Sequence, residues 1–350
     1  MPELPPNVFT RPAVLPASLR LQQWCDGMRL TRWGRAWHAR LKKWAAHTRW
    51  ASAEGQFTYH RDGHDYPITF DGRNHQFHAI YDECYRRGYE AETSRLIARL
   101  LPGASGAFFD IGANWGYYSL LAAAIPGYSG QIFPFEPNPR VFADLTSVIE
   151  QAGLATRVSP AAAGVGETDG ELRVEETDDF HTGLARLVPG STGVRVPVRQ
   201  LDHCDLPNPI FIKIDAEGME APILRGAKAI LARARPHLIF ESFLDSLHPE
   251  NTQQPMEFLQ TLGYRCFMPV LVFERGGRLA FTSYGDDANS LLDEQPAAAS
   301  GLFALTPQSR FLAPRHVNIF ACHESRLQEV WSAGIKNVDE LIHSAPPRQG

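Results

Sequence analysis

The alternation of short apolar runs with helical segments between residues 107 and 270 is the feature that most limits how this chain can fold. Runs such as AFFDIG, IFPFEP, PIFIKIDAEG and HLIFES are bounded by strand-breaking residues. Such runs are typical of strands covered on both faces of a sheet. Because right-handed crossovers join parallel strands, the order predicts an α/β fold with an open, doubly wound, mostly parallel sheet between two layers of helices.

The flanking segments add less regular elements. We expect RVSPAAAG, after the second helix, to form a further strand, and LVFERGGRLAFT to form a hairpin that turns at Gly276 and Gly277. VNIFACH is predicted as a last strand that inserts antiparallel. Variable loops at the strand ends carry specificity in such folds. We therefore expect two segments to shape a binding cleft: the polar segment 167–206 and the region 270–315.

Residues 1–75 are predicted to be an N-terminal extension of a main domain that spans residues 76–345. A proline-rich start, with little order expected, precedes a basic stretch at 18–50 in which Leu30, Trp33, Trp37, Leu41 and Trp44 recur at helical spacing. This amphipathic helix suits an anionic membrane surface, or packing on the main domain or on a second subunit. QFTYHRDGHDYPITFDG is predicted to be a hairpin.

Composition excludes several classes of protein. The net charge of -5 argues against a nucleic-acid binder. The absence of an apolar run long enough to span a bilayer argues against a membrane helix, and the proline-broken start does not resemble a signal peptide. We therefore expect a cytoplasmic protein, with peripheral contact to the inner membrane surface as an option. Five scattered cysteines fit reduced thiols: Cys25, Cys84, Cys204, Cys266 and Cys322.

The sequence DIGANWG, at the end of the first apolar strand, is the strongest chemical signal. Gly112 and Gly116 allow a tight turn and close approach of a ligand, while Asn114 tolerates a left-handed backbone. The glycine spacing differs from the G-x-G-x-x-G of dinucleotide sites, which argues against a nicotinamide dehydrogenase. The loop instead suits a ligand that has an amino-acid end and a ribose. Asp110 can face the ammonium of the amino-acid end through the loop amides or water.

Glu136 ends the next strand, IFPFEP, twenty residues beyond Gly116. An acid at this edge of a doubly wound sheet is placed to accept both hydroxyls of a ribose. Pro137 and Pro139, on either side of Asn138, stiffen the turn that directs it.

Four ordered motifs, DIGANWGYYSLLA, FEPNP, FIKIDAEGMEAPILRGA and HLIFE, resemble the FkbM family of S-adenosylmethionine (AdoMet)-dependent methyltransferases over residues 80–245. The resemblance implies a Rossmann-like class I methyltransferase fold, AdoMet as the donor, and transfer to a hydroxyl of a carbohydrate, glycan or secondary metabolite. A binding protein that holds AdoMet without turnover, recruited through its N-terminal helix, is the alternative. The implied donor residues are Glu90, Thr93, Asp110, Gly112, Ala113, Asn114, Gly116, Glu136 and Asn138.

The motif KIDAEG carries the candidate catalytic groups. Strand alternation places Lys213 and Asp215 on one face and leaves Asp215 and Glu217 at the carboxyl end of the strand. Asp215 is the first choice as the base, with Glu217, Glu241 and His181 as alternatives. Two acids are too few to predict a Mg²⁺ site, so no metal is expected.

Overall fold

The computed structural model describes residues 8–10, 15, 20, 54–82, 85, 88–174, 187–188, 193–275, 278–283, 292 and 296–344. The predicted Trp-rich helix at 18–50, apart from Arg20, lies outside the described residues, as do His181, Cys25 and Cys84. Within the described part of the chain, no helix has the length and apolar character needed to cross a bilayer.

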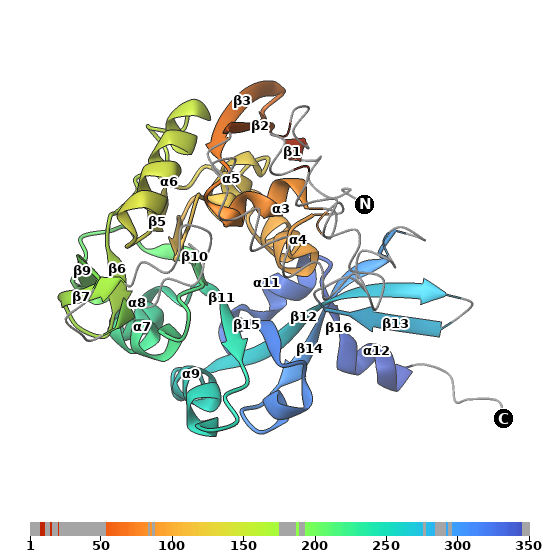
Figure 1. Ribbon diagram of the computed structural model, residues 1–350. Coiled ribbons are helices and arrows are strands. Elements are labelled where there is room, and N and C mark those ends of the chain that lie inside the picture. Colours follow the sequence, from red (N-terminus) through yellow and green to blue (C-terminus); the bar gives the residue numbers. More distant parts are fainter. Residues whose placement is uncertain are drawn as a thin grey trace, which may run out of the picture.

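A central mixed sheet, with four adjacent parallel strands, organises the molecule (Figure 1). Four parallel strands come first, and an antiparallel strand, β15, then pairs with the last of them. In spatial order the sheet contains β5 (Ile132–Phe135), β4 (Ala107–Ile111), β10 (Pro209–Ile214), β11 (His237–Phe243), β15 (His316–His323), β12 (Tyr264–Arg275), β14 (Ala299–Leu305) and β16 (Lys336–Asn337), and β13 (Arg278–Thr282) pairs with β12. The predicted α/β fold is confirmed, and so is the antiparallel insertion of β15. The prediction that this strand is the last one was wrong, because β16 follows it in the chain.

Two hydrophobic cores lie on opposite faces of this sheet, because successive strand residues point to opposite sides. Every residue of β4 is buried, with Phe108 in one core and Phe109 and Ile111 in the other. The first face is covered by α3 (His78–Tyr81), α4 (Ala91–Leu100), α5 (Tyr117–Ala124), α6 (Pro139–Gln151) and α11 (Leu327–Ser332), and the second by α7 (Glu220–Gly226), α8 (Lys228–Ala234) and α9 (Pro249–Thr261). Helix α12 (Val338–Ser344) packs beside β14 and β16.

The predicted N-terminal hairpin is confirmed as β2 (Glu54–Arg61) and β3 (His64–Asp71), joined at Asp62 and Gly63. Both turn residues have positive φ, as a tight two-residue turn requires. The expectation of little order in the proline-rich start was wrong for β1 (Phe9–Thr10), which pairs with β2. The hairpin shares the core of the following domain, and the boundary at residue 75 stays a prediction.

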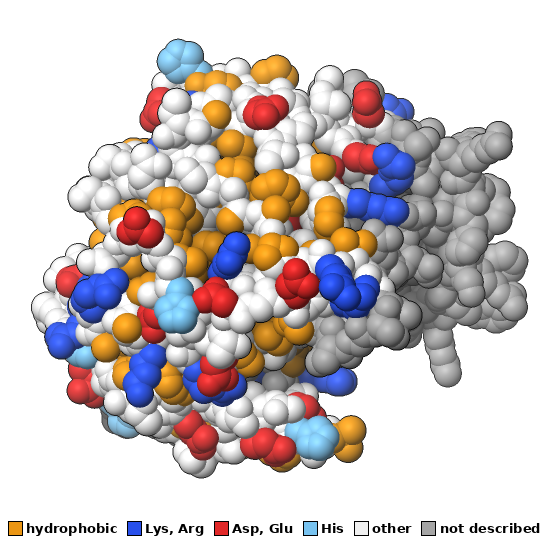
Figure 2. Space-filling view, turned by 90° about the vertical axis from the view of Figure 1, so that its left-hand side faces the viewer, with side chains coloured by type: hydrophobic (Ala, Val, Ile, Leu, Met, Phe, Trp, Pro, Cys, Tyr) orange, Lys and Arg blue, Asp and Glu red, His pale blue; other side chains and the backbone are white. Residues whose placement is uncertain are grey.

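The segment RVSPAAAG, which follows α6, does not form the expected continuous strand. RVSPAAAG makes only isolated bridges to β5, at Val158 and Ala161, because Pro134 of β5 has no N–H to donate to the Ser159 carbonyl between them. A second sheet follows, formed by β6 (Gly164–Gly166), β9 (Val194–Gln200), β7 (Gly170–Val174) and β8 (Leu187–Val188). Figure 2 shows acidic and basic side chains interspersed over the described part of this side of the molecule.

Strands β12 and β13 pair antiparallel up to Arg275 and Arg278, as the predicted hairpin requires, while its two turn glycines lie outside the described residues. Short 3₁₀ turns complete the described elements: η3 (His75–Phe77), η6 (Leu201–His203), η7 (Ser309–Leu312) and η8 (Glu324–Arg326).

Candidate functional site

A cavity of about 300 Å³ lies at the carboxyl ends of β4, β5, β10 and β11. Ligands bind at this edge in doubly wound sheets, where the strand order reverses. Three of the five described non-glycine residues with positive φ line it: Glu90, Asn114 and Glu217. Backbone strain of this kind concentrates at functional sites, so the cavity is the candidate binding site.

The loop after β4 forms the floor of the cavity and requires glycine at its first position. Gly112 has φ +73°, and a Cβ atom there would lie 1.8 Å from the carbonyl oxygen of Asp215. Only glycine lets this loop meet the loop after β10. Gly112, Ala113 and Asn114 line the cavity. Gly116, with φ +95°, is instead the N-cap of α5 and is absent from the lining.

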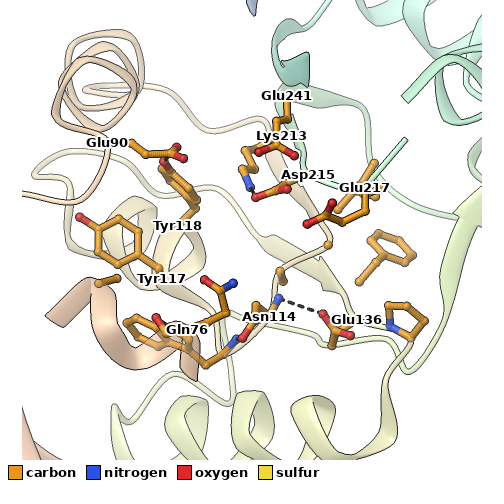
Figure 3. Close-up of a pocket in the computed structure, with 18 of the residues that line it drawn as sticks. Gln76, Glu90, Asn114, Tyr117, Tyr118, Glu136, Lys213, Asp215, Glu217 and Glu241 are labelled. Atoms are coloured by element: carbon orange, nitrogen blue, oxygen red, sulfur yellow. Dashed lines mark hydrogen bonds and ion pairs between the residues drawn. The ribbon is translucent and has the colours of Figure 1, made fainter. Parts of the chain in front are cut away.

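Glu136, at the end of β5, is clamped by two backbone amides. The N–H of Asn114 donates to Oε2 at 3.0 Å, and the N–H of Asn138 donates to Oε1 at 2.8 Å (Figure 3). Burial raises the pKa of Glu136 to about 7, although these two hydrogen bonds favour the carboxylate. Each carboxylate oxygen keeps a further lone pair, so Glu136 can still accept hydroxyl donors from the cavity.

Three other predicted donor residues lie outside the cavity lining. Asn138 caps α6, where its side chain accepts from the N–H of Arg140. Thr93 is buried beneath the site and accepts from Asn318 at 3.2 Å. Asp110 is 1% exposed and accepts from the Ser119 hydroxyl at 2.7 Å, while its Oδ1 has no hydrogen-bond partner among the described residues.

Glu90, also predicted for the donor site, lines the cavity from the N-terminus of α4. Its carboxylate accepts from the hydroxyl of Tyr118 and, at 2.9 Å, from the side-chain amide of Asn318 on β15. Burial raises the pKa of Glu90, and the Lys213 ammonium opposes that shift. The hydrogen bond from Asn318 therefore connects Glu90, which precedes β4 in the chain, to β15 near the C-terminus.

Lys213 and Asp215 form a buried ion pair at the end of β10, with 2.7 Å between Nζ and Oδ2. The ammonium also lies 4.8 Å from the ring centre of Tyr118. Burial opposes the charged form of Lys213, yet Asp215, Asp110 and Glu90 outweigh burial and raise its pKa. Burial acts to raise the pKa of Asp215, but Lys213 lowers it below its ordinary value.

Glu217 and Glu241 face the same end of the cavity as Asp215 (Figure 3). One oxygen from each of the three carboxyl groups lies within 4.8 Å of the others, so they are the described residues that could hold a metal ion. Burial and the nearby carboxylates of Asp215 and Glu217 raise the pKa of Glu241 well above its usual range. Its Oε1 lies 2.5 Å from Nε2 of His316.

The sequence prediction missed several residues that line the cavity. Gln76 comes from the segment after the hairpin, Tyr117 and Tyr118 from α5, and Phe243 and His316 from β11 and β15. The tyrosines stood within the DIGANWGYY motif and could have been named. His316 precedes the predicted strand VNIFACH, but only the pairing of His316 with Phe243 brings it to the site.

The parallel strands, the antiparallel β15 and the cavity at the switch point define a Rossmann-like α/β fold. More specifically, residues 110–266 match the family model described as the Methyltransferase FkbM domain, which confirms the resemblance. Over these residues the chain is similar to an FkbM methyltransferase domain.

One curated relative is the hexuronic acid methyltransferase AglP of Haloferax volcanii, 26% identical over 121 residues. The match covers 34% of this chain and 48% of AglP, so the chain spans about half the length of that relative. Among solved structures, the FkbM methyltransferase of Methylobacillus flagellatus is 18% identical with a TM-score of 0.37, covering 51% of this chain and 44% of its own. An AdoMet-dependent O-methyltransferase of Thermotoga maritima is 12% identical with a TM-score of 0.35, covering 76% and 77%.

Proposed function

We propose that the protein is an AdoMet-dependent O-methyltransferase that acts on a hydroxyl of a carbohydrate, a glycan or a secondary metabolite. The observation that carries the proposal is the Glu136 carboxylate, fixed by the amide of Asn114 at the edge of a cavity within the FkbM domain. A fixed acid at this strand end is suited to the two hydroxyls of a ribose.

The residues present fit AdoMet along the length of the cavity. Glu136 would accept from the ribose, while the loop at Gly112, Ala113 and Asn114 leaves main chain open to the ligand. The acidic side chain of Glu90 would face the ammonium of the methionine end. Asp110 is buried behind the cavity wall, and its Oδ1, which has no hydrogen-bond partner among the described residues, would act on this end only through the loop amides or water.

When bound, AdoMet would supply an electrophilic methyl group: the acceptor hydroxyl oxygen would form a bond to the methyl carbon in line with the breaking C–S bond, and S-adenosylhomocysteine would leave as a neutral thioether. Alignment of the two reactants can contribute about 7–11 kcal/mol, more than a positioned base, which adds about 10²- to 10⁴-fold. Asp215 is the proposed proton acceptor. The hydroxyl proton becomes strongly acidic as the new C–O bond forms, so a carboxylate with a lowered pKa is sufficient, and Lys213 orients it.

The acceptor class is inferred from the relative AglP, whose name specifies a hexuronic acid, and from the loops around the cavity. We propose that the segments 167–206 and 270–315 shape the acceptor cleft. A cytoplasmic location, with membrane, glycan-assembly or self-association contacts through residues 18–50, completes the proposal.

Calorimetric titration with AdoMet tests the donor site directly. The full chain should bind AdoMet, and a screen of glycans with radiolabelled AdoMet should detect methyl transfer. Asp215→Asn should lower turnover by about 10²- to 10⁴-fold with donor affinity little changed. Glu257→Gln, an exposed change on α9, is the control.

Failure of the full chain to bind AdoMet would contradict the proposal. Binding without transfer to any acceptor would favour the alternative, an AdoMet-binding protein recruited through its N-terminal segment. Full activity of Asp215→Asn would exclude Asp215 as the proton acceptor.

A further inference from the structure

Phe243 and His316 form a flat pair of rings at one end of the cavity. Phe243 is the last residue of β11 and His316 is the first of β15, and they stand opposite each other in the antiparallel register. Their ring centres lie 4.3 Å apart with 12° between the ring planes, and both residues line the cavity. The stacked His316 ring therefore supports one orientation of Phe243.

The exposure of Phe243 distinguishes it from the rest of its strand. The other six residues of β11 are buried, whereas Phe243 is 44% exposed. Aromatic side chains supply much of the contact area in small-molecule sites, and a few polar groups fix the orientation of the ligand. An exposed aromatic ring in a cavity wall is suited to a flat, apolar part of a ligand.

Carboxyl groups lie beside this ring. Alternate residues of a strand share a face, so Glu241 lies on the same side of β11 as Phe243, and its Oε1 is 2.5 Å from Nε2 of His316. One oxygen each of Asp215, Glu217 and Glu241 lies within 4.8 Å of the others (Figure 3). A sugar ring has a face of C–H groups and an edge of hydroxyls, so it can satisfy both kinds of surface.

The charge at this end of the cavity distinguishes between kinds of sugar. Lys213 is the one Lys or Arg among the described residues of the lining, and its ammonium lies 2.7 Å from Asp215. Burial lowers the pKa of His316 below its ordinary value, so the ring is mostly neutral near pH 7. Lys213 balances Asp215, and Glu217 adds a second carboxylate. The described side chains here therefore repel an anionic ligand.

Resting on the proposed function, we propose that the acceptor is an uncharged sugar, bound with one face of its ring on Phe243. Glu217 accepts a hydrogen bond from one of its hydroxyls. A uronic acid at the same place would bring its carboxylate close to like charge, which discriminates against it. The acceptor class thus differs from the hexuronic acid that the name of the relative AglP specifies.

Matched pairs of sugars and radiolabelled AdoMet test the charge preference of the full chain. The pairs are the methyl glycosides of glucose, galactose and mannose and those of the corresponding uronic acids. At least one neutral sugar should be methylated with a kcat/KM about tenfold or more above that of its uronic counterpart. Glu217→Gln should reduce this preference by about tenfold, because it removes the like charge.

Phe243→Leu tests the contribution of the flat ring. It should raise the KM for the neutral sugar by about tenfold, with kcat and AdoMet affinity little changed. Phe243→Tyr keeps the ring and should keep the KM of the unmodified protein. The matched control is Phe311→Leu, because Phe311 is 38% exposed on η7 and lies outside the cavity lining. It should change none of these values.

Circular dichroism shows which variants fold, and if either Phe243→Leu or Glu217→Gln is unfolded or inactive, the other decides. The inference is overturned if a uronic acid is methylated as fast as its neutral counterpart, or if folded Phe243→Leu keeps the unmodified KM. A chain that binds AdoMet in calorimetry but methylates no neutral sugar also overturns it, while the donor site stands. Failure to bind AdoMet would contradict the proposed function itself, and this inference with it.

Discussion

Glu90, Asn114 and Glu217 hold left-handed backbone conformations at three corners of one cavity, with φ between 42° and 50°. Each such conformation costs on the order of 1–3 kcal/mol in a non-glycine residue. Contacts with neighbouring groups must therefore stabilise each of these conformations. The hydrogen bond from the N–H of Asn114 to Glu136 is one such contact. Asparagine tolerates this backbone, so Asn114 was predictable from its type, whereas no local signal marks Glu90 or Glu217.

The ionisation of Glu136 should control donor affinity. Because the pKa of Glu136 is raised to about 7 in the free protein, the neutral acid is populated below that value and the carboxylate above it. Ribose hydroxyls donate to the carboxylate, so we expect AdoMet affinity to rise from about pH 6 to about pH 8, with binding releasing a proton.

Glu136→Gln should bind AdoMet more weakly and lose that part of the pH dependence, as measured by calorimetry across the same range. Glu257→Gln should follow the unmodified protein. Parallel pH curves for Glu136→Gln and the unmodified protein would show that another group titrates.

At the scale of elements, the register of β15 against β11 completes the end of the cavity near Asp215. Phe243 pairs with His316, and Glu241 pairs with Asn318. The rings of Phe243 and His316 stack at 4.3 Å between centres. The sequence predicted an antiparallel strand here, but register depends on side-chain packing across strands and could not be deduced from the apolar pattern.

Arg310, in η7, fixes the segment that leads into β15. It is fully buried and donates to Ser242 Oγ at 2.9 Å, to the Ser242 carbonyl at 2.6 Å, and to the carbonyls of Pro314 and Arg315. No sequence pattern distinguished Arg310 from exposed arginines, because its partners are mainly backbone carbonyls distributed over two segments.

Arg310→Met should lower the free energy of unfolding by about 2–4 kcal/mol, because it leaves several acceptors unpaired. Arg310→Lys should restore little, since an ammonium lacks the planar fork of donors. Urea denaturation measures both changes. Arg315→Met removes an exposed side chain nearby and should change stability by less than about 0.5 kcal/mol. An unfolding midpoint of Arg310→Met close to that of Arg315→Met would contradict this role.

For the whole molecule, the order of apolar segments was sufficient to predict the layers, because each buried strand must be covered on both faces. The same reasoning placed Glu136 and Asp215 at one edge of the sheet. It did not predict the second sheet of β6, β9, β7 and β8, because β6 and β8 are only three and two residues long and β7 is mostly polar, while the apolar alternation of β9 (VRVPVRQ) was a signal left unused. Contacts between segments that are distant in the sequence, such as Phe9 with Trp115, also produce no local sequence pattern from which they could be predicted.

Phe9, in β1, should stabilise the domain beside the loop that follows β4. Phe9 lies against Trp115 and Tyr117, with ring centres 6.0 and 5.0 Å apart. Phe9→Ala should lower the free energy of unfolding by about 1–3 kcal/mol and weaken AdoMet binding. Glu54→Ala, exposed at the start of β2, should change neither in urea denaturation and calorimetry. Unaltered stability of Phe9→Ala would show that this contact adds little.

The bond from Asn318 to Glu90 joins residues 228 positions apart. During synthesis, the ribosome delivers the glycine loop and both acidic strand ends long before Asn318 leaves the exit tunnel. Contacts of such long sequence separation form late, because much of the chain must first be ordered. A nascent polypeptide can therefore assemble the end of the cavity at Glu136 early, while the wall around Glu90 closes only after nearly the entire length has been translated.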